Sequence, residues 1–216
     1  MHMMLAILKT SVAMPKLLYV LRTSKCGNNP LLDQFDTMLR KGLTEILNVD
    51  LSDDQWLQAS LPIRDGDLGI KSARMLAPSA FLASAASTLL LQQSIFPDGT
   101  WAADDQAIQC TESLWTNLAN SPEPAAEVHH IQKAWDGMVA ANQRSIILSK
   151  PSSETDKARL LAVSTPHAGD WLHAPPITAV GLRLSDEGVR VAVARGKIVN
   201  ARGMCDSRCA VISPQL

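Results

Sequence analysis

Aromatic residues are scarce in this sequence: they make up 4% of 216 residues, with one tyrosine and three phenylalanines. Hydrophobic residues as a whole reach 46%, which is close to the globular norm. Aliphatic and alanine side chains must therefore supply most of the buried surface, and we expect a core of closely packed helices.

Long apolar runs are also missing. No uninterrupted apolar run reaches the roughly 18 residues that a membrane-spanning helix needs. Lys9 and Lys16 interrupt the most apolar stretch, residues 1–21, and that stretch lacks the basic start of a secretory signal. These absences predict a soluble, non-secreted chain without a membrane partner, in the nucleus or the cytoplasm.

The chain has little net charge, -1 in total, which argues against a general nucleic-acid binder. The charges are unevenly spread, however. Residues 1–48 hold six basic and three acidic side chains, residues 49–149 hold five and twelve, and residues 150–216 hold nine and six. Two mildly basic ends flank an acidic middle, a pattern that solvated helix faces also produce.

Cysteines are few and widely spaced, so a disulfide framework is not expected. Only Cys205 and Cys209 lie close enough in sequence to share a metal ion. A structural zinc site needs four ligands, and no histidine follows His173, so we predict no metal site.

Catalytic motifs are missing as well. The sequence has no G-x-S-x-G nucleophile turn, and the glycines at 66 and 69 fit neither phosphate-binding glycine pattern. Asp104 and Asp105 resemble a polymerase metal pair. They follow a Pro-Asp-Gly turn and precede a helical pattern, so we interpret them as the first turn of a helix. The sequence predicts no catalytic residue and no cofactor.

The remaining histidines offer no clear ligand set. His129 and His130 are adjacent and point to different helix faces, while His167 and His173 lie in a proline-rich segment without partner cysteines. We interpret all four as surface or packing residues.

Apolar spacing predicts a mainly α fold. The expected helices cover residues 3–12, 16–22, 30–47, 52–58, 72–93, 103–119, 123–148, 155–163 and 184–195. We divide the chain into a helical bundle over 1–94, a helical connector over 95–149, and short helices with an irregular tail over 150–216.

A series of short strings, in order along the chain, resembles the polyproteins of non-LTR (LINE-type) retrotransposons. They are VAMPKLLYVLRT (12–23), PLLDQFD (30–36), QWLQASLP (55–62), GDLGI (66–70), APSAFLAS (77–84), HIQKAW (130–135), DWLHAPP (170–176) and VGLRLSDE (180–187). The resemblance covers nearly the whole chain.

This resemblance implies the thumb and the helical connector that follow the catalytic palm of a reverse transcriptase. A thumb grips duplex nucleic acid through its backbone, which gives register without sequence readout. The candidate contacts are Lys9, Lys16, Arg22, Lys25, Arg40 and Lys41. The implied partners are an RNA–DNA duplex and the palm and endonuclease domains of a parent polyprotein.

Two departures from the family stand out. Asp67 replaces the second glycine of the family's Gly-Gly-Leu-Gly loop, and this replacement argues against the tight backbone geometry of that loop. Residues 196–203 resemble the middle of the family's zinc knuckle, but two cysteines cannot close it. We expect a non-catalytic fragment with weak, sequence-independent nucleic-acid binding. A domesticated helical protein-interaction module is the alternative.

Overall fold

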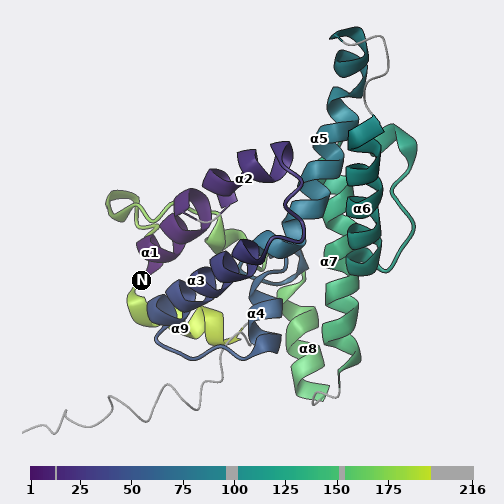
Figure 1. Ribbon diagram of the computed structural model, residues 1–216. Coiled ribbons are helices and arrows are strands. Elements are labelled where there is room, and N and C mark those ends of the chain that lie inside the picture. The colour runs from purple at the N-terminus through teal and green to yellow at the C-terminus, as the bar shows by residue number, and fades with distance from the viewer. Residues whose placement is uncertain (13, 96–101, 151–153, 196–216) are drawn as a thin grey trace, which may run out of the picture. The chain divides into compact units, whose positions relative to one another are not determined.

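The computed structural model describes residues 1–12, 14–95, 102–150 and 154–195 (Figure 1). These residues form helices joined by turns and loops, and they contain no β-strand. The mainly α fold expected from the sequence is therefore confirmed.

Most helices are α-helices, with short 3-10 or π segments between them. The α-helices are α1 (His2–Ile7), α2 (Met14–Thr23), α3 (Pro30–Leu47), α4 (Asp53–Ala59), α5 (Ala73–Ile95), α6 (Ala102–Ala119), α7 (Gln132–Ser149), α8 (Glu154–Val163) and α9 (Asp186–Arg195). The π segment is η1 (Leu8–Val12), and the 3-10 turns are η2 (Ile63–Asp65), η3 (Ala126–Val128), η4 (Asp170–Leu172) and η5 (Thr178–Val180).

The chain forms two compact units, each built from segments that are far apart in sequence. Unit 1 takes its described residues from 1–8, 40–69 and 154–195, and unit 2 takes them from 9–39, 70–95 and 102–150. These units cut across the three consecutive segments suggested by the sequence. The reason is tertiary packing: α5 packs against α2, α6 and α7, so the connector helices share a core with earlier ones.

Local sequence signals fix the ends of several helices. Asn29 caps α3, because its Oδ1 accepts from the Leu31 N–H at 3.0 Å, and Pro30 occupies the first helical position. Ser52 caps α4 in a reciprocal arrangement with Gln55, whose side chain accepts from the Ser52 N–H at 2.8 Å. Both helices begin where these residues predict.

The helix expected over 123–148 begins later than predicted, at Gln132. The preceding segment is held as a turn by side chains. His129 Nε2 lies 2.7 Å from the Pro124 carbonyl oxygen, and the Trp135 indole N–H donates to the His129 carbonyl at 2.7 Å. These side-chain bonds join residues five and six positions apart, in place of the first helical turns, and sequence periodicity does not reveal them.

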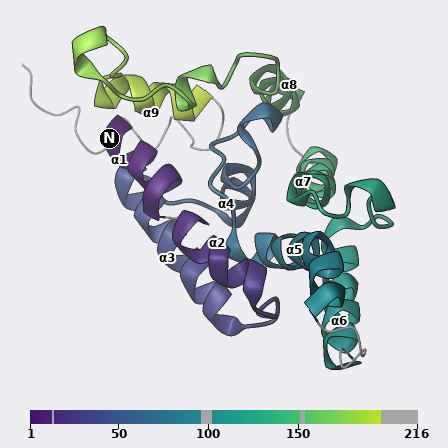
Figure 2. The ribbon, with the colours of Figure 1, turned by 90° about the horizontal axis from the view of Figure 1, so that it is seen from above.

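The core of unit 2 is formed by α5, α6 and α7, which lie side by side in both ribbon views (Figures 1 and 2). Its centre is the ring pair of Trp115 and Trp135, which meet edge to face with centroids 4.9 Å apart and planes at 81°. Such aromatic pairs add stability beyond their buried area. Leu82, Ala83, Ala119 and Val139 complete this buried cluster.

Two helical segments, His2–Thr23 and Ala73–Ile95, are long and apolar enough to cross a membrane by length and composition alone. Residues of the first half of α5, among them Leu76, Ala80 and Leu82, are buried in the protein. A core helix meets the same criterion as a membrane helix. The expected lack of a membrane partner therefore stays a prediction.

Candidate nucleic-acid interface

The six candidate cations are divided between the two units. Lys9 lies in η1, Lys16 and Arg22 lie in α2, and Lys25 lies in the following turn, all within unit 2. Arg40 and Lys41 belong to the part of α3 that is in unit 1. The two sets are therefore considered separately.

Helix α2 has a buried face and a charged, exposed face. Met14 and Leu21 are buried, whereas Lys16 and Arg22 are exposed, and the helix packs against α5. These two cations are separated by about 240° around the helix axis at 3.6 residues per turn. They therefore lie on different exposed sides of α2 and do not form one basic stripe.

Arg22 is held in place by a neutral partner. Its Nε and Nη2 atoms both donate to Oε1 of Gln132 on α7, at 3.2 and 2.9 Å. An amide oxygen orients the guanidinium group without cancelling its charge. Arg22 is thus a positioned cation.

Lys25 projects from a turn that is anchored to the core of unit 2. The Cys26 N–H donates to the Ser24 carbonyl, and the Asn29 N–H donates to the Cys26 carbonyl, each at 2.8 Å. A Cβ atom on Gly27 would lie 3.2 Å from Leu114 Cδ1 of α6, so the turn fits closely against that helix. The exposed Lys25 is therefore carried on a well-fixed backbone.

Lys9 differs from the other three cations of unit 2. Its side chain is half-buried, and burial lowers the pKa of its ammonium group. Part of the Lys9 side chain is therefore not accessible to an outside ligand. Lys16, Arg22 and Lys25 remain the exposed cations of the predicted set in this unit.

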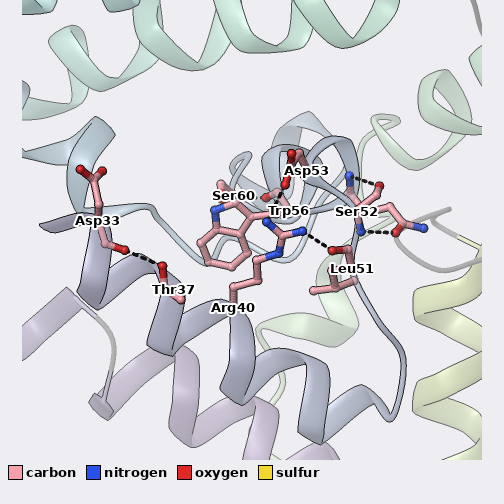
Figure 3. Close-up of polar contacts among 9 residues, drawn as sticks. Asp33, Thr37, Arg40, Leu51, Ser52, Asp53, Trp56 and Ser60 are labelled. Carbon is pink, nitrogen blue, oxygen red and sulfur yellow. Dashed lines mark hydrogen bonds and ion pairs between the residues drawn. The ribbon is translucent and has the colours of Figure 1, made fainter.

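Arg40 is engaged inside unit 1 (Figure 3). Its Nη1 forms an ion pair with Asp53 Oδ1 at 2.6 Å, and its Nη2 donates to the Leu51 carbonyl. The guanidinium group thereby ties α3 to the start of α4, and its charge is balanced by a carboxylate. Lys41, the next residue, is exposed.

The glycine loop keeps its tight backbone despite Asp67. Gly66 and Gly69 adopt positive φ values of 96° and 70°, whereas Asp67 is not among the residues with positive φ. The Asp67 position therefore does not require glycine. Its side chain is buried instead, and its Oδ1 accepts from the Leu68 N–H at 2.7 Å.

The residues weighed as metal or catalytic groups are scattered. His129 is half-buried among turn and ring contacts, and His130, His167 and His173 are exposed, as the sequence predicted.

Residues 104 and 105 fall in the first part of α6. In the described ranges, no three His, Cys, Asp or Glu side chains gather as a metal site would require. Cys205, Cys209 and the knuckle-like residues 196–203 lie outside the described residues.

An open depression of about 530 Å³ lies on α6 and the loop after it. Its lining is polar and acidic: Gln109, Glu112, Ser113, Thr116, Asn117 and Glu123. Burial raises the pKa of Glu112, and the nearby carboxylate of Glu123 raises it further. Carboxylates repel phosphates, so this depression does not suit a nucleic-acid backbone.

The chain matches no protein-family model, no curated protein sequence and no solved structure. Its family and its function are therefore matters of inference from its own residues.

Sequence reasoning overlooked two residues of unit 2. Tyr19, the single tyrosine of the chain, is 75% exposed on α2. Its position three residues after Lys16 places the two side chains next to each other on a helix and could have drawn attention to it. Asp36 is buried and binds the start of α5. In the sequence, a carboxylate within the apolar stripe of Leu32, Leu39 and Leu43 could have indicated a buried, hydrogen-bonded aspartate.

Proposed function

We propose that this chain is a non-catalytic segment of a LINE-type retrotransposon reverse transcriptase, corresponding to the thumb and connector. Its proposed activity is weak, sequence-independent binding of duplex nucleic acid through the backbone. The ordered series of family-like strings supports the assignment, and the mainly α fold agrees with it. The parent palm and endonuclease domains are its proposed partners.

One observation supports the binding activity most directly: residues 1–32 contain no Asp or Glu. Within this stretch, Lys16, Arg22 and Lys25 are exposed, and Arg22 is oriented by a neutral amide. Cations without nearby carboxylates in their own segment keep their charge for phosphate groups.

Backbone contacts of this kind have a measurable signature. Each neutralised phosphate releases condensed counterions, so affinity falls with salt concentration in proportion to the number of contacts. Three phosphate contacts on a duplex give a slope of log affinity against log salt of about -3. Arg40 is expected to add little, because Asp53 already balances its charge.

The test is titration of an RNA–DNA duplex with the full chain at several salt concentrations. The triple variant Lys16→Gln, Arg22→Gln, Lys25→Gln should bind more weakly and show a nearly flat salt dependence. The matched control is Arg64→Gln, Lys133→Gln, Arg183→Gln, which removes the same charge at three other exposed positions. Equal losses in both variants, or no duplex binding by the parent chain, would reject the proposal.

The alternative is a domesticated helical protein-interaction module, and one surface favours it. The last turns of α5 extend beyond α6 and α7 (Figure 1) and expose Leu89, Leu90, Leu91 and Ile95, which are 49% to 80% exposed. Exposed apolar clusters often mark protein contacts. A stable oligomer in sedimentation, combined with no affinity for duplex, would favour this alternative.

The proposal also includes the absence of polymerase and nuclease activity in the isolated chain. Primer extension and nicking assays with Mg²⁺ or Mn²⁺ test this directly. Turnover in either assay that persists through purification would contradict it.

A further inference from the structure

We propose that Tyr19 stacks on a base of single-stranded nucleic acid while Lys16 neutralises a neighbouring phosphate. This inference rests on the proposed nucleic-acid-binding function and adds a second class of ligand, an unpaired strand, at the same helix. It concerns only α2 and the elements of unit 2 that pack against it.

The first supporting observation is the exposure of the Tyr19 ring. A tyrosine normally buries much of its ring, yet Tyr19 is 75% exposed in a chain with few aromatic residues. Its backbone is fixed by the helix, and its carbonyl accepts from the Thr23 hydroxyl at 2.9 Å. A rigidly carried, exposed ring presents a face on which a base can stack.

The second observation is the arrangement around the ring. Lys16 and Thr23 lie one turn before and one turn after Tyr19, and both are exposed. Residues three or four apart on a helix are neighbours, with Cβ atoms about 5–6 Å apart. The ammonium group of Lys16 can therefore reach the phosphate next to a stacked base, and the Thr23 hydroxyl lies on the same side.

The third observation is the sign of the local charge. Residues 1–32 hold no acidic side chain, and α5, the helix that packs against α2, carries no Asp or Glu from Ala73 to Ile95. The acidic groups in the unit 2 part of α3 are engaged: Asp33 pairs with Arg74 at 3.0 Å, and Asp36 is buried. On α7, Asp136 lies beside Gln132, the partner of Arg22, and pairs with Lys71 at 2.7 Å. The exposed side of α2 is thus complementary to a polyanion.

A lipid surface is the competing polyanion, and the shape of α2 disfavours it. Helices that lie in a membrane interface expose a broad apolar face. On α2 the residues Met14 and Leu21 are buried, Leu17 and Leu18 are partly buried, and the exposed apolar side chains are Pro15, Tyr19 and Val20. One ring beside one cation suits a stacked base better than an acyl layer.

The test compares fluorescently labelled oligothymidylate with an RNA–DNA duplex of equal length, using the full chain. Tyr19→Ala should weaken binding of the single strand roughly tenfold, because alanine removes the stacking surface. Tyr19→Phe keeps the ring and should bind the single strand as the parent does. Val20→Ala, a neighbouring exposed apolar change, is the control and should have no effect.

The outcomes separate this inference from the proposed function. If the parent chain binds duplex but Tyr19→Ala binds oligothymidylate like the parent, the stacking role is wrong and the duplex function stands. If Tyr19→Ala weakens the binding of duplex and single strand equally, the loss comes from a general structural effect, and the stacking role is wrong. If the parent binds neither nucleic acid but binds phosphatidylserine vesicles, both proposals are wrong. A Lys16→Gln loss confined to low salt would support the paired phosphate contact.

Discussion

Asp67 is the most unusual single residue of the chain, because its carboxyl group is buried without full hydrogen bonding. Its Oδ1 accepts from the Leu68 N–H at 2.7 Å, whereas its Oδ2 lacks a hydrogen bond of regular geometry. Burial raises the pKa of Asp67 well above 3.8, although the bonds from Leu68 and from Gln58 oppose the shift. At pH values between the pKa of the unfolded chain and the raised pKa of the folded chain, the folded chain therefore keeps a proton that the unfolded chain loses.

This shift predicts how stability depends on pH. Because folding raises the pKa of Asp67, the free energy of unfolding should fall as pH rises above 3.8. Asp67→Asn is neutral at every pH and should raise the free energy of unfolding at pH 8 by about 1 to 3 kcal/mol. Urea unfolding at pH 5 and pH 8 measures both effects.

The control for Asp67 is Asp50→Asn, an exposed aspartate of the same unit. It should not reproduce the gain in stability at pH 8. A variant Asp67→Asn that is less stable than the parent at pH 8 would show that the buried carboxylate is well accommodated.

The candidate cations show what sequence can and cannot reveal about single residues. The family resemblance and the basic start of the chain selected Lys16, Arg22 and Lys25 as candidates, and these three are exposed. The same signals also selected Arg40, which forms an ion pair with Asp53. A pairing across 13 positions depends on how α3 meets α4, and helical periodicity carries no such information.

Helix α5 begins at a cap that two elements share. The Asp36 carboxylate on α3 accepts from the backbone N–H groups of Ala73 and Arg74, at 2.7 and 3.2 Å, and from the Ser72 hydroxyl at 2.5 Å. The Ser72 Oγ in turn accepts from the Met75 N–H at 3.3 Å. Sequence alone identified Ser72 as the start of this helix and missed Asp36.

Removing this cap should destabilise unit 2. Asp36→Ala leaves the two backbone N–H groups and the Ser72 hydroxyl without their acceptor, and should lower the free energy of unfolding by about 1 to 2 kcal/mol. Asp36→Asn retains one oxygen acceptor and should lose less. Urea unfolding followed by tryptophan fluorescence suits this test, because Trp115 and Trp135 lie in the same unit.

The comparison variant is Asp33→Ala, one turn earlier on α3. Asp33 forms an exposed ion pair with Arg74, and such pairs contribute about 0.5 kcal/mol or less. If the two alanine variants were equally stable, the cap would have no special role in holding α5.

Helix boundaries were predictable where the signals are local. Pro30 with Asn29, and Ser52 with Gln55, supply their own caps, so α3 and α4 begin where expected. The start of α7 was wrong, because His129 and Trp135 satisfy the preceding backbone through contacts that are not helical. Caps can be predicted from the residues at the helix end, whereas competing side-chain bonds such as those of His129 and Trp135 cannot be predicted from periodicity.

For the molecule as a whole, the discontinuous units predict that residues 1–94 will not fold alone. That piece lacks α6 and α7, so the apolar side of α5 would lose Trp115, Trp135 and Val139. It should show reduced helicity by circular dichroism and a poorly dispersed amide spectrum compared with the full chain. A well-folded 1–94 piece would support the consecutive bundle expected from the sequence instead.

The division into units also sets an order for folding during synthesis. Unit 2 has received all its residues once residue 150 leaves the ribosome, whereas unit 1 still waits for α8 and α9. Domains tend to fold as they emerge from the ribosome. The loop at Asp65 and Gly66, synthesised early, contacts Ser164 just after α8, whose hydroxyl donates to the Asp65 carbonyl at 2.9 Å. It therefore lacks this contact until α8 has been made, and this interval is when a nascent chain would most need a chaperone.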